Sequence, residues 1–259
     1  MKRLKFRFLR LLAVFLAFAL TGCVWLRLLE LKNQLVDFDE NVRVEVADKH
    51  FILSLLHPVL FSEDFVYLTK LNPSRTEVLP KGYRWFLDFR MDPARTPEQG
   101  KKTIVFAMTF TPDHKLSAFD FSPLFLQMAP PVFLEASVRS LGHGKVDQGR
   151  NQMKVDPEDL PKLNAKLPTR QAIEAVMGPP ELELPYQGQI ILLYHFKADA
   201  KPVADEYEKR RIAEAKLFFD PKTDELVRLV GRFAGLKLKI DYRKFVVPKE
   251  KKEKSARRN

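Results

Sequence analysis

The stretches YRWFLDFRMD (residues 83–92) and IILLYHFKAD (residues 190–199) carry the most informative pattern in this chain. Both are rich in aromatic and branched residues, which favour β-strands. They align without a gap at an offset of 107 residues, so that Phe89 falls on Phe196 and Arg90 falls on Lys197. A long match at a fixed offset is the signature of an internal repeat.

The same offset extends upstream into a short amphipathic helix in each copy. SEDFVYLTKLNPS begins at Ser62 and TRQAIEAVMGPPE begins at Thr169, and both hydroxyl residues suit a helix N-cap. The first helix is expected to end before Pro73. The second is expected to end at Gly178, because glycine is a common residue just past a helix C-terminus.

The match also extends downstream, where a polar insert follows each strand. After the insert, turns at residues 111–113 and 220–222 each join two alternating runs, which predicts an antiparallel hairpin in each copy. The sequence therefore predicts an α+β fold with two related units, each a short helix packed on a three-stranded antiparallel sheet. The alternative is two unrelated α+β stretches with similar spacing.

The segments around these copies complete the predicted organisation. Residues 23–40 carry an apolar stripe with helical spacing, which is expected to pack on the body or to lie on a lipid surface. Alternation from Val42 to Val46 predicts a hairpin that opens the first unit, residues 41–150. The second unit covers residues 151–247, and residues 248–259 form a basic tail expected to be disordered.

The N-terminus has the layout of a secretory signal. Five cationic residues precede or flank an uncharged apolar run at residues 11–20. A bilayer span needs about 20 apolar residues, so a run of ten is too short to cross a membrane.

Leu20-Thr21-Gly22-Cys23 resembles the lipobox of bacterial lipoproteins. The resemblance implies diacylglycerol on the Cys23 sulfur, removal of residues 1–22, and acylation of the new amino terminus, for example by palmitate. Several acyl chains make a stable membrane anchor, whereas one alone is marginal. The alternative is an ordinary signal, or a short uncleaved anchor with an incidental cysteine.

Val24 follows the cysteine, where inner-membrane lipoproteins have a retention aspartate. The resemblance therefore favours the outer membrane with the protein facing the periplasm, and the outer face of the inner membrane is the alternative. Cys23 is the only cysteine of the chain. Once it is acylated, no thiol remains for disulfide, redox or nucleophilic chemistry.

The formal net charge of +11 is concentrated at the two ends of the chain. Five cations lie in residues 1–22 and six lie in the tail at residues 248–259, which leaves the body near neutral. A near-neutral body argues against a nucleic-acid partner. The tail is expected to be a solvated segment, or alternatively to contact anionic lipid or envelope polymer.

No catalytic or metal-binding motif is present, so we expect neither an enzyme nor a cofactor or metal. The five histidines have no metal-ligand spacing and no G-x-S-x-G elbow occurs; the histidines are His50, His57, His114, His143 and His195. His195 is expected on the solvated face of its strand. His143, in GHGK, is expected in a turn, although its flanking glycines would also allow a ligand to approach.

Two other groups of residues have a structural and a functional interpretation. Glu63-Asp64 and Glu158-Asp159 could be paired carboxylates, but acidic residues in the first turn of a helix are explained by the helix dipole. Five phenylalanines could line an apolar groove, but strand alternation favours the core for about half of them; they are Phe106, Phe110, Phe119, Phe121 and Phe125.

The second copy resembles outer-membrane lipoproteins of the SmpA/OmlA type, on residues 167–196 and on AKLFFDPKTDELVRL at residues 215–229. The resemblance implies helices packed on a three-stranded antiparallel sheet. The best-known member of that family is an accessory subunit of the β-barrel assembly machinery, and a tandem version occurs in secreted β-lactamase inhibitor proteins. This chain departs from the pattern in having one clear helix and a long insert before Arg210.

Taken with the lipobox, these features indicate a lipid-anchored cell-envelope protein. The leading hypothesis is a non-enzymatic module that binds an envelope protein, in outer-membrane assembly or maintenance. The alternative is a carrier or sensor of an apolar ligand or an anionic envelope polymer. A third hypothesis, an envelope hydrolase, requires paired carboxylates in a cleft.

Overall fold

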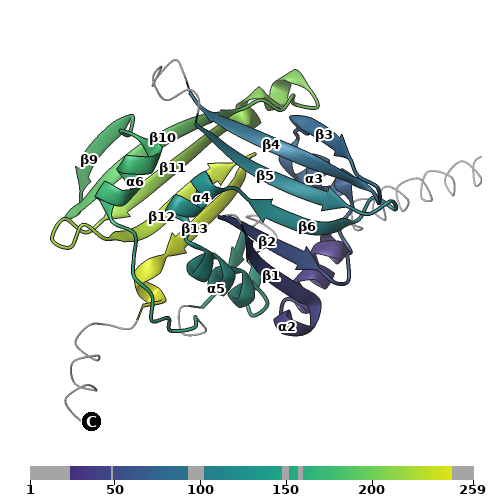
Figure 1. The fold of residues 1–259 in the computed structure, drawn as a ribbon, viewed down its shortest axis with the longest axis horizontal. Coiled ribbons are helices and arrows are strands. Elements are labelled where there is room, and N and C mark those ends of the chain that lie inside the picture. The colour runs from purple at the N-terminus through teal and green to yellow at the C-terminus, as the bar shows by residue number, and fades with distance from the viewer. Residues whose placement is uncertain (1–23, 48, 93–101, 148–151, 157–159, 247–259) are drawn as a thin grey trace, which may run out of the picture.

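The computed structural model describes residues 24–47, 49–92, 102–147, 152–156 and 160–246. The prediction of an α+β fold is confirmed: eleven of the described strands form one antiparallel sheet that curls around helices, as Figure 1 shows. Cys23, residues 1–22 and the tail at residues 248–259 lie outside the described residues, so their predicted roles stay predictions.

The first half of the sheet follows the order β1-β2-β6-β5-β4, and β3 pairs with the N-terminal part of β4. The predicted hairpin that opens this half is present as β1 and β2. The bounds are β1 Val42–Ala47, β2 His50–Leu55, β3 Arg75–Val78, β4 Tyr83–Met91, β5 Thr103–Phe110 and β6 Leu116–Phe121, with helices α2 Phe38–Asn41 and α3 Ser62–Thr69.

The second half continues the same sheet as β10-β11-β12-β13, and β9 pairs with β10. Its bounds are β9 Leu182–Tyr186, β10 Gln189–Ala198, β11 Ile212–Phe219, β12 Leu226–Phe233 and β13 Leu236–Asp241, with α6 Arg170–Met177 and the 3-10 helices η4 Asp205–Arg211 and η5 Tyr242–Lys244. Between the halves lie α4 Pro123–Met128, α5 Pro131–Leu141 and a separate hairpin, β7 Lys145–Asp147 with β8 Gln152–Lys154.

The two halves join where β4 meets β10. Phe89, Arg90 and Met91 pair with Ala198, Lys197 and Phe196 in antiparallel register. The backbone N–H of Asp92 donates to the carbonyl of His195 at 3.2 Å, and that of Asp199 donates to the carbonyl of Asp88 at 2.9 Å. The finer prediction of separate three-stranded sheets is therefore not confirmed, because this pairing merges the strands into one sheet.

The two repeated helices begin differently. Thr169 caps α6 as expected, since its hydroxyl accepts a hydrogen bond from the N–H of Ala172 at 3.2 Å. Ser62 is not the N-cap of α3, so that detail of the prediction is wrong. Phe61 occupies the cap position, and its N–H donates instead to the Asp64 carboxylate at 2.8 Å.

Aromatic side chains from both halves form the core on the concave side of the sheet. Phe106 packs against Phe125 of α4 at 5.1 Å between ring centroids and against Phe233 of β12 at 5.5 Å. Phe89 of β4 also contacts Phe233, at 5.4 Å. Of the five phenylalanines considered for a groove, Phe106, Phe110 and Phe125 are buried and the others are partly buried, so they fill the core.

A helix at residues 24–34 lies against the body at the start of the described chain. Its Leu28 and Leu31 pack on the core, while Leu26 points away and is 67% exposed. Within the ranges described, no helix combines the length and apolar character needed to cross a bilayer.

Gly142, in the GHGK turn, lets this helix end approach α5 closely. A Cβ added to Gly142 would lie 2.6 Å from the backbone nitrogen of Val36, and Lys32 Nζ donates to the Gly142 carbonyl at 2.9 Å. The space that Gly142 leaves open is thus occupied by the backbone of Leu35 and Val36, and not by a ligand. His143 beside it is exposed.

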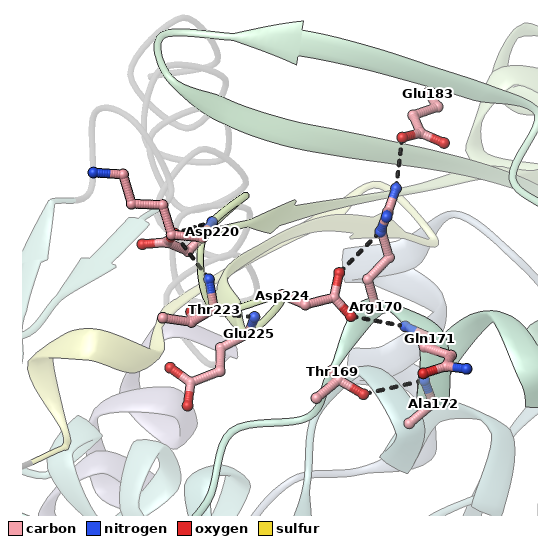
Figure 2. A network of polar contacts seen from close by, with 10 residues as sticks. Thr169, Arg170, Gln171, Ala172, Glu183, Asp220, Thr223, Asp224 and Glu225 are labelled. Carbon is pink, nitrogen blue, oxygen red and sulfur yellow. Dashed lines mark hydrogen bonds and ion pairs between the residues drawn. The ribbon is translucent and has the colours of Figure 1, made fainter.

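Figure 2 shows how α6 is fixed to the β11–β12 hairpin. Arg170 pairs with Asp224 at 3.0 Å and with Glu183 of β9 at 2.7 Å. In the same turn, the N–H groups of Lys222 and Thr223 donate to Asp220, at 2.8 and 3.4 Å. The Asp220 pKa is therefore below its ordinary value of 3.8, chiefly through the Lys222 hydrogen bond and also through Arg243.

We predict that Gly142→Ala destabilises the protein by about 1–3 kcal/mol, the usual cost of forcing an extra methyl into a packed site. His143→Ala is the control, and as an exposed substitution it should change the free energy of unfolding by less than about 0.5 kcal/mol. Denaturant unfolding of both variants measures this. Equal effects would contradict the assignment of Gly142 as a close-packing residue.

We also predict that Asp220→Asn changes how stability depends on pH. A carboxylate whose pKa is lowered by folding stabilises the protein above its unfolded pKa, and this contribution is lost as pH falls through the folded pKa. The wild type should therefore exceed the variant in stability at pH 7, and the gap should close as pH falls below 3.8. Thermal unfolding between pH 7 and pH 2 tests this, and a constant gap would refute it.

Candidate anion-binding site

The second half of the sheet has an outer face that carries several charged side chains. Along β10, Leu192, Tyr194 and Phe196 are buried toward the core. Successive side chains of a strand point to opposite faces. The odd-numbered residues of β10 therefore point outward, away from the core. Residues of β11, β12 and β13 that are paired in register with them lie on the same outer face.

Strand register places five cations of β11, β12 and β13 on this surface, beside Lys197 of β10, and we call these five the basic face. One row of neighbouring residues runs from Leu193 on β10 through Lys216 on β11 and Val230 on β12 to Lys239 on β13. The adjacent row runs from Glu214 on β11 through Arg232 on β12 to Lys237 on β13. Arg228, in a third row, lies over the Phe218 ring at 3.8 Å. The basic face consists of Lys216, Arg228, Arg232, Lys237 and Lys239.

A hollow of about 310 Å³ opens where the basic face meets η4. Lys209 and Arg210 come from η4, Arg232 from β12 and Lys237 from β13. Glu206 is the single acidic residue of the lining, which Tyr207 and Gly235 complete. Four cationic side chains from η4, β12 and β13 therefore line the same hollow, together with one carboxylate.

The local structure explains why these side chains converge. Ala234 and Gly235 have positive φ values of 49° and 76°, which allow a tight turn between β12 and β13. The Arg210 guanidinium packs directly on this turn, because a Cβ added to Gly235 would lie 2.8 Å from Arg210 Cζ. The glycine therefore makes room for the arginine at the rim of the hollow.

Electrostatics favour an anion in this hollow. The Tyr207 hydroxyl is hydrogen-bonded to Glu206, which raises the pKa of the tyrosine. Among the described residues, none of the four lining cations forms an ion pair. Like charges gathered at one place repel one another, and a bound anion relieves that repulsion while accepting charge-assisted hydrogen bonds.

His195 is on the outer face, as its strand phase predicts, but it is not solvated. Its side chain is 14% exposed, with Nδ1 bonded to Glu181 and Nε2 3.4 Å from a Glu214 oxygen. Across the described ranges, no group of three histidine, cysteine or acidic residues is arranged to hold a metal ion. The cluster is therefore a polar layer beside the basic face.

The other histidines are dispersed. His50 contacts Asp120 at 2.8 Å, and His114, in its predicted turn, contacts the Tyr83 hydroxyl at 2.9 Å. His57 and His143 are exposed. The structure does not bring these residues into one site.

The candidate carboxylate pairs also separate. Glu63 is exposed, whereas Asp64 is buried and pairs with Arg27, with one contact of 2.7 Å. Glu158 and Asp159 lie outside the described residues. Asp64 therefore has a structural role in capping α3 and holding the helix at residues 24–34.

The basic face and its hollow were not anticipated from the sequence. Their cations are spread from Lys209 to Lys239, and the body they belong to is near neutral. A usable signal was nevertheless present in RLVGRFAGLKLKID (residues 228–241), where cations recur among apolar residues. Such alternation places charges on one face of a strand pair.

We predict that inorganic pyrophosphate raises the melting temperature of the protein and does so less in Arg210→Ala/Arg232→Ala. A ligand that binds only the folded state stabilises it by mass action. The control Lys81→Ala/Lys166→Ala removes the same charge at exposed sites elsewhere. Differential scanning fluorimetry at fixed ionic strength measures this, and an equal shift in all three proteins would mean that the hollow does not bind the anion.

No family model matches this chain, and no curated protein and no solved structure matches it.

Proposed function

We propose that this protein is a lipid-anchored, non-enzymatic binding protein of the cell envelope that recognises an anionic envelope polymer. The observation that carries the proposal is the hollow with Lys209, Arg210, Arg232 and Lys237 on its walls. Arg232 and Lys237 belong to both the hollow and the basic face, so the two surfaces are continuous. A polymer with repeated phosphate or carboxylate groups could engage both.

The physical basis of recognition is multiple charge contact. Arginine presents several N–H donors in a fixed fork that matches phosphate and carboxylate oxygens, and lysine adds a point charge. Contacts between exposed charges are screened by salt, so binding of this kind weakens as ionic strength rises. The polymer rather than a small ion is favoured because the cations extend across three strands.

The proposed location rests on the lipobox. Acylation of Cys23 would hold the protein on the outer membrane facing the periplasm, where anionic polymers are within reach. The outer face of the inner membrane is the alternative. The basic tail at residues 248–259 is a second candidate for polymer contact, and the experiment below separates the two.

We also propose that the chain contains an internal duplication. The elements α3, β3, β4, β5 and β6 recur in order as α6, β9, β10, β11 and β12. At the offset of 107 residues, Arg90 corresponds to Lys197, and these two residues pair with each other across the seam. Equivalent residues that face one another support a local twofold relation between the halves. The resemblance of the second half to SmpA/OmlA lipoproteins stays a prediction.

The two proposed copies differ at the site. Lys216 of β11 corresponds to Ala107 of β5, since both strands have eight residues and end at a phenylalanine before a turn. The Lys216 cation of the basic face therefore has no counterpart in the first copy.

A protein partner is the second candidate function, and β9 favours it. Leu182, Leu184 and Tyr186 share one face of this edge strand and are exposed. Exposed apolar side chains gathered on one surface mark interaction sites. Pro185 has no N–H to offer at the strand edge, so we expect a partner to contact the side chains rather than to add a strand.

We predict that the purified full-length protein binds lipopolysaccharide and peptidoglycan fragments but not neutral dextran. Arg232→Ala/Lys237→Ala should weaken binding about 10-fold or more and reduce its salt dependence. The Lys81→Ala/Lys166→Ala control and deletion of residues 248–259 should change affinity by less than about 3-fold. Fluorescence titration at several salt concentrations measures this.

The outcomes discriminate among the candidates. If the tail deletion alone abolishes binding, the polymer site is the tail and not the hollow. If no polymer binds and crosslinking from a probe at Leu184 captures one envelope protein, the second candidate replaces the first. If Cys23→Ser leaves the protein in the membrane fraction, the lipid anchor is refuted.

A further inference from the structure

The folded body begins immediately after the proposed anchor. Val24 is 7% exposed, and the helix at residues 24–34 starts with it. Cys23 is its neighbour in the chain, and consecutive Cα atoms are about 3.8 Å apart. An acyl group on Cys23 would therefore be attached within one residue of the buried body, with no linker between them.

Three contacts hold this helix in place. Arg27 Nε donates to Asp64 at 2.7 Å, and the Asp64 side chain is 2% exposed. Lys32 donates to the Gly142 carbonyl, and the backbone of Leu35, whose side chain is buried, lies against the same glycine. Breaking a buried ion pair by removing one partner is strongly destabilising, so this helix is a fixed part of the body.

The surface beside Val24 is apolar with a cationic rim. Leu26 is 67% exposed, and Leu56, which is two residues before Pro58 in the chain, is 42% exposed. A shallow hollow of about 400 Å³ lies beside Leu26, and its walls include Pro58, Val59 and Phe61, with Glu30 as its one acidic residue. The Arg27 and Lys115 cations lie 5.1 and 5.8 Å from the centre of the Phe61 ring.

We propose that this end face, formed by Leu26, Leu56, Pro58, Val59 and Phe61, lies in the headgroup layer of the bilayer that holds the acyl chains. Because the anchor has no linker, acylation places this surface at the membrane and fixes the orientation of the body. Apolar side chains enter the interface, while long cationic side chains extend to the phosphate groups. The inference rests on the proposed acylation of Cys23.

This orientation has a consequence for the basic face. Figure 1 places the first helices, in purple, on the opposite side of the fold from β9, β10 and β11. The strand β11, which carries Lys216 of the basic face, is therefore presented away from the bilayer surface.

A single-thiol experiment tests this orientation. Cys23 is the only cysteine of the chain, so in the acylated protein any introduced cysteine is a unique free thiol. Leu26→Cys and Leu56→Cys probe the end face, and Leu184→Cys and Lys239→Cys are exposed controls in the second half. Each purified lipidated variant is labelled with bimane and reconstituted into phosphatidylethanolamine/phosphatidylglycerol vesicles that contain brominated lipid.

We predict at least 3-fold stronger quenching at Leu26→Cys and Leu56→Cys than at the two controls. Mass spectrometry of the same samples establishes whether Cys23 carries acyl groups. Acylated protein with equal quenching at all four positions would overturn the inference and leave the lipid anchor intact. Protein without acyl groups on Cys23 would overturn both.

Discussion

The antiparallel pairing of β4 with β10 is the interaction on which the rest of the structure depends. Within the residues that the structure describes, three residue pairs join the strands, flanked by the hydrogen bonds from Asp92 and Asp199 and by the Arg90–Asp199 ion pair at 2.7 Å. This short seam makes one sheet from two sets of strands. It also brings Phe89 and Phe233 into contact, so that the aromatic core is shared between the halves.

Once the sheet is continuous, its curvature decides which surfaces can act. The concave side is filled by aromatic side chains and by α4 and α5, and Tyr242 at the end of the sheet is buried there with its hydroxyl bonded to the Met128 carbonyl. Burial also raises the pKa of Tyr242, which keeps its hydroxyl protonated as a donor. In the second half, the convex side carries the basic face.

Several local features could be predicted because neighbouring residues determine them. The hairpin of β1 and β2, the cap at Thr169, the end of α6 at Gly178 and the strand character of residues 83–91 and 190–198 all follow from short-range preferences. The cap at Ser62 was wrong for a specific reason. The Asp64 carboxylate accepts the Phe61 N–H, and this moves the cap by one residue.

The candidate site was less accessible to sequence reasoning. Its cations come from η4, β12 and β13, and their convergence depends on the tight turn at Ala234-Gly235 and on Arg210 packing over it. The prediction for His195 was correct in one respect and wrong in another. Its side chain points to the outer face as predicted, but it is partly buried there because Glu181, just before β9, and Glu214 of β11 pack against it.

The sequence by itself predicted α3, α6, the β1–β2 hairpin, the strands β4 and β10, and the β5–β6 and β11–β12 hairpins, because each of these depends on a few consecutive residues. It also supplied the proposed site of lipid attachment. Only the tertiary structure decided that the strands form one sheet and that dispersed cations meet at one hollow. The reason is that strand pairing between distant segments depends on which edges meet and on how side chains pack between them. Neither is encoded in the spacing of residues along either strand.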